Sequence, residues 1–259
     1  MKAVVQAVDA TSFVTASEAS YQAKKTATLL KTLNVNALIM GEVGVGKKSL
    51  AIFILPDAPI LDASNFDELL TSIESCDEII ITNIDNSPNI KRLIDTINES
   101  SIRVIATSKS FFTNDFINDL FSVKFTIPPL IEREEDVALL VKSFVKEAAL
   151  LFGFTKEFNM DNFHADLREN SKSLRKQVTM TYLMQDIGDS ELMSIMENYL
   201  YDKMGSSSDY RNFLYLYEVP LIRAGLAKFK SQLQLSDKLG LNRNTLRKKI
   251  SDNKQYLEE

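Results

Sequence analysis

Residues 36–55 read NALIMGEVGVGKKSLAIFIL, and this stretch decides the fold. Its short apolar run ends at Gly41, which is typical of a buried strand that enters a turn, and the residues from Lys47 onward predict a helix. The turn between them has the pattern G-x-x-x-x-G-K, in which backbone N–H groups approach a phosphate and the lysine reaches the terminal phosphates. The stretch therefore predicts a phosphate-binding loop, with a plain glycine-rich turn as the alternative. The predicted loop residues are Gly41, Glu42, Val43, Gly44, Val45, Gly46, Lys47, Lys48 and Ser49.

The segments around this loop alternate between strand-like and helix-like runs. Short apolar runs predict further strands at residues 58–63, 77–85, 101–108 and 123–130. The runs between and before them predict helices at 17–33, 65–75 and 88–100. Three consecutive isoleucines at 79–81 indicate burial on both faces, as in a parallel sheet. The expected fold class is therefore α/β, with a doubly wound parallel sheet.

The rest of the chain is predicted to be helical. Beyond Glu134 no strand-like run recurs, and amphipathic runs predict helices at 134–153, 173–187 and 189–204. The segment GSSSD at 205–209 has the composition of a linker. We therefore expect an α/β subdomain at 1–133 and a helical subdomain at 134–204. The linker then joins them to a small all-α domain at 210–259.

The composition is that of an ordinary globular protein, with 45% hydrophobic and 25% charged residues. No apolar run reaches the roughly 18 residues that a membrane span needs, and the acidic Asp9 argues against a signal peptide. A single cysteine, Cys76, excludes an internal disulfide framework and a cysteine-rich zinc site. We expect a cytoplasmic protein with no membrane partner and no metal site.

Charge is unevenly distributed along the chain. The net charge is −5, but residues 221–254 carry nine Lys or Arg against two Asp, a local charge of +7 that leaves −12 on the remainder. An acidic body with a basic end fits a DNA-reading module attached to a domain that does not bind DNA. A solvated charged helix is the alternative that charge alone leaves open.

The basic end predicts a helix, a turn at Gly240 and a second helix, from the sequence LSDKLGLNRNTLRKKI at 235–250. The apolar side chains expected to pack these helices together are Leu235, Leu239, Leu241, Leu246 and Ile250. Asparagine is a good N-cap, and arginine and asparagine bind guanine and adenine edges in the major groove. We therefore predict base readout by Asn242, Arg243 and Asn244, and phosphate contacts by Thr245, Arg247, Lys248 and Lys249. A basic hairpin that contacts only protein is the alternative.

The surroundings of the phosphate loop lack the usual hydrolytic residues. The position after Lys47 is Lys48, so the hydroxyl that often ligates Mg²⁺ is absent there. The isoleucine-rich strand ends in Thr82 and Asn83, where a P-loop hydrolase has an Asp that holds the metal and a Glu that activates water. Asp85 follows two or three residues too late. We therefore predict binding of ATP or ADP, with no catalytic residue and without the ligands that Mg²⁺ usually needs.

Several segments together resemble one family, the NtrC-like bacterial enhancer-binding proteins, which are AAA+ ATPases that activate sigma-54 RNA polymerase. The resemblance rests on GEVGVGKK at 41–48, similar to GESGTGKE, on RVIATSKS at 103–110, similar to the sensor-I strand, and on IPPLIEREEDVALLVKSFV at 127–145, similar to LPPLRERxEDI. SLRKQV at 173–178 stands where the family has NVRELxN. GLNRNTLRKKI at 240–250 is close to the consensus of the Fis-type helix-turn-helix that ends many of these regulators.

This resemblance implies an AAA+ nucleotide-binding fold with a helical lid, followed by a Fis-type DNA-binding domain. It implies a sensor-II arginine at Arg175, which would contact nucleotide, and contacts to the DNA backbone at Ser231 and Gln232. Because no sensory domain precedes residue 17, any signal is expected to arrive through the AAA+ body or a partner. Fis-type units dimerise through the helices before the reader, which implies a homodimer or higher homo-oligomer formed through Phe213, Leu214, Leu216, Tyr217, Leu221 and Ile222.

Three departures from the family bear on function. The GAFTGA loop that touches sigma-54 is absent, the acidic pair after the isoleucine-rich strand is missing, and no arginine lies between Arg103 and Arg133 to act as a finger. We therefore predict a sequence-specific transcription regulator that binds double-stranded DNA and carries a degenerate AAA+ body. Two alternatives remain: a working ATPase that uses Asp85 or Asp77 and remodels RNA polymerase, and a partner or anti-activator that co-assembles with a full-length homologue.

Overall fold

The structure, a computed structural model, describes residues 13–109, 115–153, 155, 157–160, 163–185 and 187–257. Asp9 and Ser110, the last residue of the predicted sensor-I segment, lie outside these residues. Internal contacts divide the chain into two units, residues 1–186 and residues 187–259, and each is described by itself. None of the helices in the described residues is long and apolar enough to cross a lipid bilayer.

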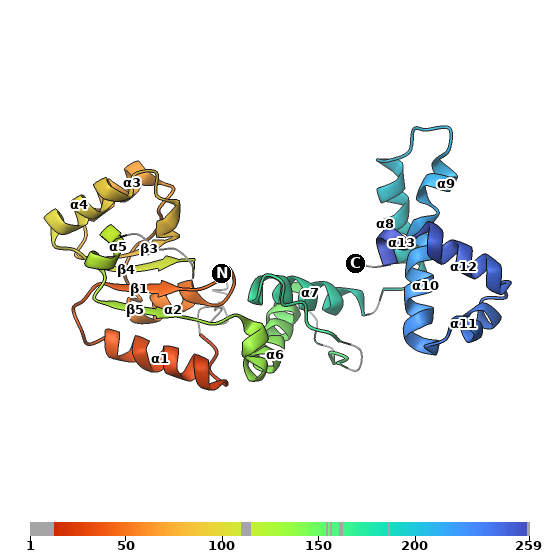
Figure 1. The fold of residues 1–259 in the computed structure, drawn as a ribbon, viewed down its shortest axis with the longest axis horizontal. Helices are drawn as coiled ribbons and strands as arrows, with labels where there is room; N and C mark the ends of the chain where they lie inside the picture. Colours follow the sequence, from red (N-terminus) through yellow and green to blue (C-terminus); the bar gives the residue numbers. More distant parts are fainter. Residues whose placement is uncertain are drawn as a thin grey trace, which may run out of the picture. The chain divides into compact units, whose positions relative to one another are not determined.

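The first unit is built on a five-stranded sheet with the order β2-β3-β4-β1-β5, in which every neighbouring pair is parallel (Figure 1). All five strands fall within predicted segments, so the predicted parallel α/β sheet is confirmed. Parallel strands end at the same edge of a sheet, and the loops that follow β1, β3 and β4 therefore meet there. The strands are β1 (Ala37–Met40), β2 (Ile60–Asp62), β3 (Glu78–Thr82), β4 (Arg103–Ser108) and β5 (Val123–Thr126).

Helices cover both faces of this sheet, as the isoleucine-rich strand predicts. Ile79 and Ile81 pack with α3, α4 and α5 on one face, whereas Ile80 packs with α1 and α2 on the other. Each fully buried isoleucine contributes about 1.5–3 kcal/mol relative to an exposed one. The helices are α1 (Glu18–Leu30), α2 (Lys47–Ile54), α3 (Phe66–Ile73), α4 (Ile90–Ser100) and α5 (Asp115–Leu120), and the 3-10 turns are η1 (Ile84–Asn86) and η2 (Leu130–Glu132).

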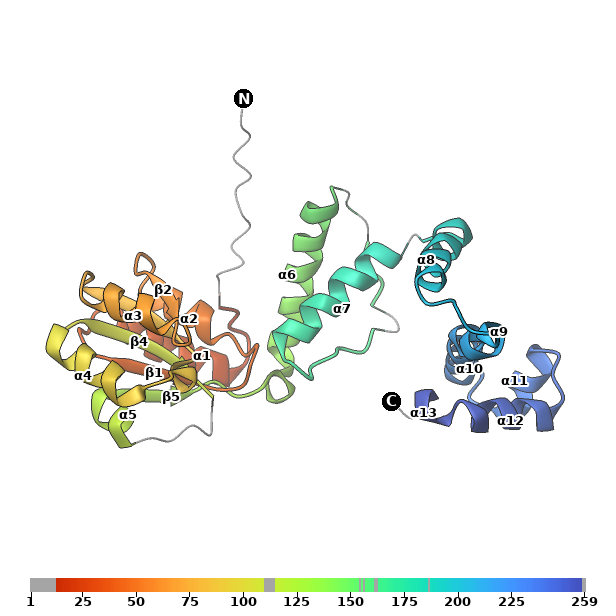
Figure 2. The same cartoon turned by 90° about the horizontal axis from the view of Figure 1, so that it is seen from above.

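Two further helices of the first unit, α6 (Glu134–Phe152) and α7 (Ser171–Met184), cross each other in Figure 2. Their shared core includes Val141 and Phe144 of α6 and Leu174 and Val178 of α7, all buried. α6 ends at Gly153, whose φ angle of 72° lies in the left-handed region, as the sequence predicts. The pair forms a helical subdomain next to the sheet, in the position that a lid would occupy.

The second unit is helical throughout its described residues. The contacts divide the chain before its first helix, α8, whereas the sequence predicted the division after that helix, at 205–209. α8 has no buried residue. The helices of this unit are α8 (Asp189–Tyr201), α9 (Asp209–Phe213), α10 (Tyr215–Phe229), α11 (Gln232–Lys238), α12 (Arg243–Asp252) and α13 (Lys254–Leu257).

Candidate nucleotide site and candidate nucleic-acid interface

The predicted phosphate loop joins β1 to α2 at the carboxyl edge of the sheet. Gly44 and Gly46 have φ angles of 81° and 105°, a left-handed backbone that favours glycine. Within the described part of the chain, the backbone N–H groups from Val43 to Lys48 have no hydrogen-bond acceptor. Free N–H groups ahead of a helix N-terminus are the donors that bind phosphate oxygens. The loop therefore fits the phosphate groups of a nucleotide.

Lys47 stands at the first position of α2 and is folded back against the loop. Its ammonium donates hydrogen bonds to the carbonyl oxygens of Gly41, at 2.5 Å, and Glu42, at 2.8 Å. Burial lowers the pKa of the Lys47 ammonium below its usual value, an effect that Asp85 opposes and Lys109 adds to. The ammonium is thus held at the mouth of the loop, where a phosphate could replace its two carbonyl acceptors.

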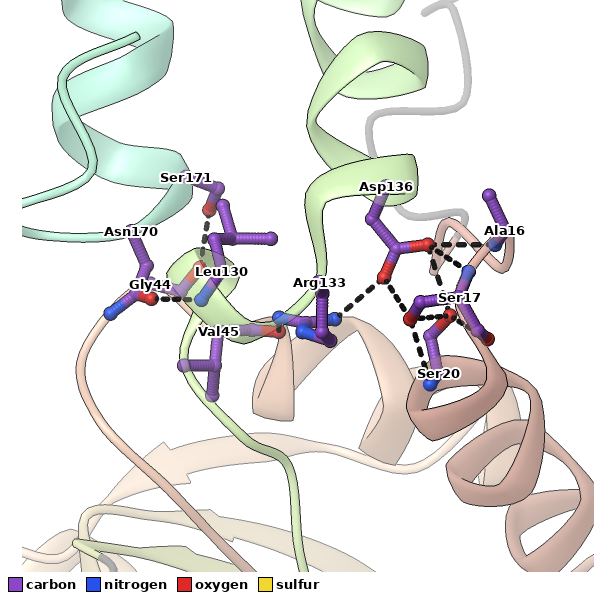
Figure 3. Close-up of polar contacts among 10 residues, drawn as sticks. All are labelled: Ala16, Ser17, Ser20, Gly44, Val45, Leu130, Arg133, Asp136, Asn170 and Ser171. Carbon is purple, nitrogen blue, oxygen red and sulfur yellow. Dashed lines mark hydrogen bonds and ion pairs between the residues drawn. The ribbon is translucent and has the colours of Figure 1, made fainter.

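Two residues at the start of α7, Asn170 and Ser171, hydrogen-bond to the phosphate loop and to the segment before α6 (Figure 3). The amide of Asn170 donates to the Val43 carbonyl at 2.9 Å, and its oxygen accepts from the Leu130 N–H at 2.7 Å. The backbone N–H and the hydroxyl of Ser171 both donate to the Gly44 carbonyl, at 3.1 and 2.6 Å. Sequence reasoning missed both residues. The loop carbonyls are therefore engaged by the helical subdomain, which leaves the loop N–H groups for a ligand.

A buried ion pair continues this network toward α1 (Figure 3). Arg133 donates to the Val45 carbonyl at 2.9 Å and pairs with Asp136 at 3.2 Å. Asp136 in turn accepts hydrogen bonds from Ala16, Ser17 and Ser20, at distances from 2.7 to 3.1 Å. Both charged residues are buried, with exposed fractions of 2% and 0%. The segment that resembles LPPLRERxEDI thus ties together the phosphate loop, α6 and the start of α1.

Three further residues were predicted to bind nucleotide, namely Arg175, Lys48 and Ser49. Arg175 pairs with Glu147 of α6 at 3.3 Å, and its guanidinium lies over the ring of Phe144 at 5.1 Å. These contacts are within the helical subdomain, and the sensor-II contact of Arg175 with nucleotide stays a prediction. Lys48 is exposed and Ser49 is half-buried, both in the first turn of α2.

At the same edge as the phosphate loop, the end of β3 carries polar residues where a hydrolase has its acidic pair. Thr82 and Asn83 both donate to Asp62 of β2, at 3.2 and 2.7 Å. Burial would raise the pKa of Asp62, but hydrogen bonds from Ser64, Asn83 and Thr82 together hold it below its usual value. No cluster of three or more His, Cys, Asp or Glu able to hold a metal ion occurs in the described ranges. The protein residues at this edge do not fit the ligand set of a divalent cation.

In the second unit, α11 and α12 form the predicted helix-turn-helix around Gly240, whose φ angle is 62°. Leu235 and Leu246 are fully buried, and they pack with Ile222 of α10. Asn242 caps α12, because its side chain accepts from the Asn244 N–H at 2.9 Å. α10 and α11 approach so closely that a Cβ on Gly225 would lie 2.2 Å from a methyl carbon of Leu235. The core predicted between these helices is therefore present, although Leu241 is only half-buried.

Most side chains predicted to contact DNA lie on the exposed surface of this hairpin. Ser231 is different, since it is half-buried and its hydroxyl caps α11 by accepting from the Gln234 N–H. Lys249 is half-buried and ion-paired with Glu218 of α10, so its phosphate contact stays a prediction. Ile222 is buried in the core and cannot serve a dimer surface, whereas Tyr217 is exposed. The exposed predicted residues are Gln232, Asn242, Arg243, Asn244, Thr245, Arg247 and Lys248.

Comparisons with known proteins add sequence relatives from one class of regulator. No family model matches the chain. The DNA-binding transcriptional regulator NtrC of Rhizobium meliloti (strain 1021) is 27% identical over 202 residues, which cover 59% of this chain and 42% of NtrC. The regulator of the same name from Azospirillum brasilense is 27% identical over 201 residues, which cover 60% of this chain and 42% of the relative. The chain therefore spans less than half the length of these curated relatives.

Crystal structures of NtrX from Brucella abortus, in complex with ADP and with ATP, resemble the chain with TM-scores of 0.55 and 0.57. The alignments cover 93% and 92% of this chain and 69% and 68% of the NtrX chains. The fold is that of the AAA+ P-loop proteins. Sequence identity to NtrX is 19% and 17%, so this likeness establishes the fold alone. The sequence relatives, together with this fold, support an NtrC-like AAA+ family for the chain.

Proposed function

We propose that the protein is a sequence-specific DNA-binding transcription regulator that reads DNA with α12. The observation that carries this proposal is the division of α12 into two faces. Leu246 is fully buried, whereas Arg243, Asn244 and Arg247 are exposed on the polar face. A short helix anchored by its apolar face and free on its basic face is the form in which a recognition helix enters the major groove.

The proposed contacts follow from the position of each side chain on α12. Asn242, Arg243 and Asn244 stand at the helix start, where base contacts cluster, and we assign them base readout. Thr245, Arg247 and Lys248 are assigned phosphate contacts, and Arg247 is also within reach of a base. Gln232 and Ser231 are assigned to the DNA backbone at the start of α11, Ser231 while its hydroxyl keeps its capping role.

A homodimer is the proposed DNA-binding form. Half-buried apolar residues remain on α9 and α10 after Ile222 has been taken into the core, among them Phe213, Leu214 and Leu216. Two readers related by a two-fold axis would contact half-sites whose centres are about 34 Å, one helical turn, apart. The expected operator is therefore an imperfect inverted repeat.

Selection from a pool of random DNA duplexes tests the proposed DNA reading. We expect the full chain to enrich one motif with two-fold symmetry and to bind it at least about 1,000-fold more tightly than random duplex. The affinity for that motif should fall with salt at a logarithmic slope near −5 if about six phosphates are neutralised per dimer. Recovery of no motif after repeated rounds would contradict the proposal.

We further propose that the AAA+ body binds ATP or ADP through residues 41–49 and hydrolyses it poorly or not at all. Support comes from the free N–H groups of the phosphate loop and from the replacement of the acidic pair by Thr82 and Asn83, which bind Asp62 instead. Without a carboxylate in that position, the usual general base that activates the attacking water is missing.

A phosphate-release assay with ATP and Mg²⁺ tests the proposed loss of turnover. Wild-type protein should release phosphate at a rate within about twofold of the Lys47→Ala variant, because general-base catalysis, worth about 100- to 10,000-fold, is missing. The second candidate function, a working ATPase, is favoured by one observation: the Asp85 side chain is buried, with only 8% exposed, and lies near Lys47. Turnover that falls to the Lys47→Ala level in Asp85→Asn would establish that function instead.

A further inference from the structure

A second lysine stands beside the phosphate loop, and neither the fold nor the proposed function assigns it a role. Lys109 directly follows β4, and its ammonium lies 4.0 Å from a carboxylate oxygen of Asp85 in η1. Lys47, Asp85 and Lys109 follow β1, β3 and β4, so all three lie at the carboxyl edge of the parallel sheet. The Lys109 side chain is half exposed, so its ammonium is accessible to a ligand.

The Asp85 carboxylate is arranged to hold lysines more than a metal ion. One of its oxygens pairs with Lys109, and the other is buried without a hydrogen-bond partner among the described residues. Mg²⁺ in a nucleotide site is usually held by one or two carboxylates besides the phosphates, and a lysine paired with Asp85 repels a divalent cation. Asp62, another carboxylate at this edge, already accepts hydrogen bonds from Thr82 and Asn83.

Two lysines at this edge supply positive charge of the kind that a lysine and a metal ion usually supply together. In P-loop NTPases a lysine and Mg²⁺ together neutralise the terminal phosphates, and an acidic pair offsets part of the ion's charge. Here Lys47 and Lys109 supply two positive charges, and the negative charges that act on Lys47 are those of Asp85 and Glu42. Thr82 and Asn83 are neutral, so no further carboxylate at their positions calls for a cation.

We propose that Lys109 takes the place of Mg²⁺ in this protein, so that the loop binds the terminal phosphates of ATP between Lys47 and Lys109 without a divalent cation. Asp85 is the positioning residue that holds Lys109 toward the loop in the absence of ligand. This inference rests on the proposed binding of nucleotide by residues 41–49 and specifies the chemistry of that site.

Calorimetric titration of the full chain with ATP, in Mg²⁺ and separately in excess EDTA, tests the inference. The Kd of the wild type should be equal in the two buffers within about threefold. In EDTA, Lys109→Met should raise the Kd by about tenfold, as expected for loss of one charge-assisted contact. Lys91→Met, which removes an exposed lysine from α4, is the matched control and should leave the Kd unchanged.

Any result other than these expected Kd values contradicts the inference. ATP binding that requires Mg²⁺ would overturn it while leaving the proposed nucleotide binding intact, and so would an unchanged Kd for Lys109→Met in EDTA. Asp85→Asn gives an independent readout, because a Mg²⁺-dependent gain in affinity that disappears in this variant would make Asp85 a metal ligand. No binding of ATP in either buffer would overturn both the inference and the proposed nucleotide binding.

Discussion

Replacing Arg243 with alanine is expected to weaken binding to the selected DNA site by roughly 10- to 100-fold, since one bidentate arginine–guanine contact is worth about 1–3 kcal/mol. Arg243 is the first residue of α12 and is exposed, and Asn242 fixes the start of the helix by capping it. The side chain takes no part in the core of Ile222, Leu235 and Leu246. Its loss should therefore remove affinity and base preference without unfolding the domain.

Fluorescence anisotropy with the selected duplex and with a scrambled duplex measures this effect. Arg211→Ala is the control, because Arg211 is an exposed arginine of the same unit that lies on α9, outside the helix-turn-helix. It should lower the affinity for both duplexes by the same small factor. Arg243→Ala should instead lose affinity mainly for the selected duplex. Equal losses on the two duplexes would assign Arg243 to phosphate rather than base contact.

Replacing Asp136 with alanine is expected to lower the free energy of unfolding of the first unit by about 3–5 kcal/mol, as for other buried ion pairs that lose one partner. Asp136 is fully buried and is the ion-pair partner of Arg133, which is itself buried. The variant would leave the guanidinium without its counter-charge. It would also remove the acceptor that holds Ser17 and Ser20 at the start of α1.

Native-state hydrogen exchange at the amides of β1 and β4 in the full chain measures this loss of stability. Glu135→Ala is the matched control, since Glu135 precedes Asp136 on α6 but is exposed, and its loss should change stability by less than about 0.5 kcal/mol. Ser20→Ala removes one hydrogen bond and should cost about 1 kcal/mol. A stability of Asp136→Ala equal to that of Glu135→Ala would show that the ion pair does not hold the network.

Local patterns were enough to predict the sheet and the helix-turn-helix. The run Ile79–Ile81 specifies a strand buried on both faces, and the pattern of Leu235, Leu246 and Gly240 specifies two helices around a turn. These features depend on periodicity and on turn chemistry, both of which are written in neighbouring residues. The linker at 205–209 stays a prediction: the contacts divide the chain at residue 187, and α8, which lies between the two positions, has no buried residue.

The site was predicted less completely, because many of its contacts join distant parts of the chain. Asn170 and Ser171 reach the phosphate loop across more than a hundred residues, and no local pattern marks them. Nothing in the sequence indicated that Arg175 would pair with Glu147 of α6 or that Lys249 would pair with Glu218 of α10.

Substitution of 7-deazaguanine for each guanine of the selected site tests base readout by α12 most directly, because it removes only the N7 acceptor in the major groove. If Arg243 contacts a guanine edge, one guanine per half-site should be found at which the change weakens wild-type binding by about tenfold. The same change should have no effect on the binding of Arg243→Ala. Wild-type binding that is indifferent to 7-deazaguanine at every position, or an equal loss in both proteins, would contradict base readout by Arg243.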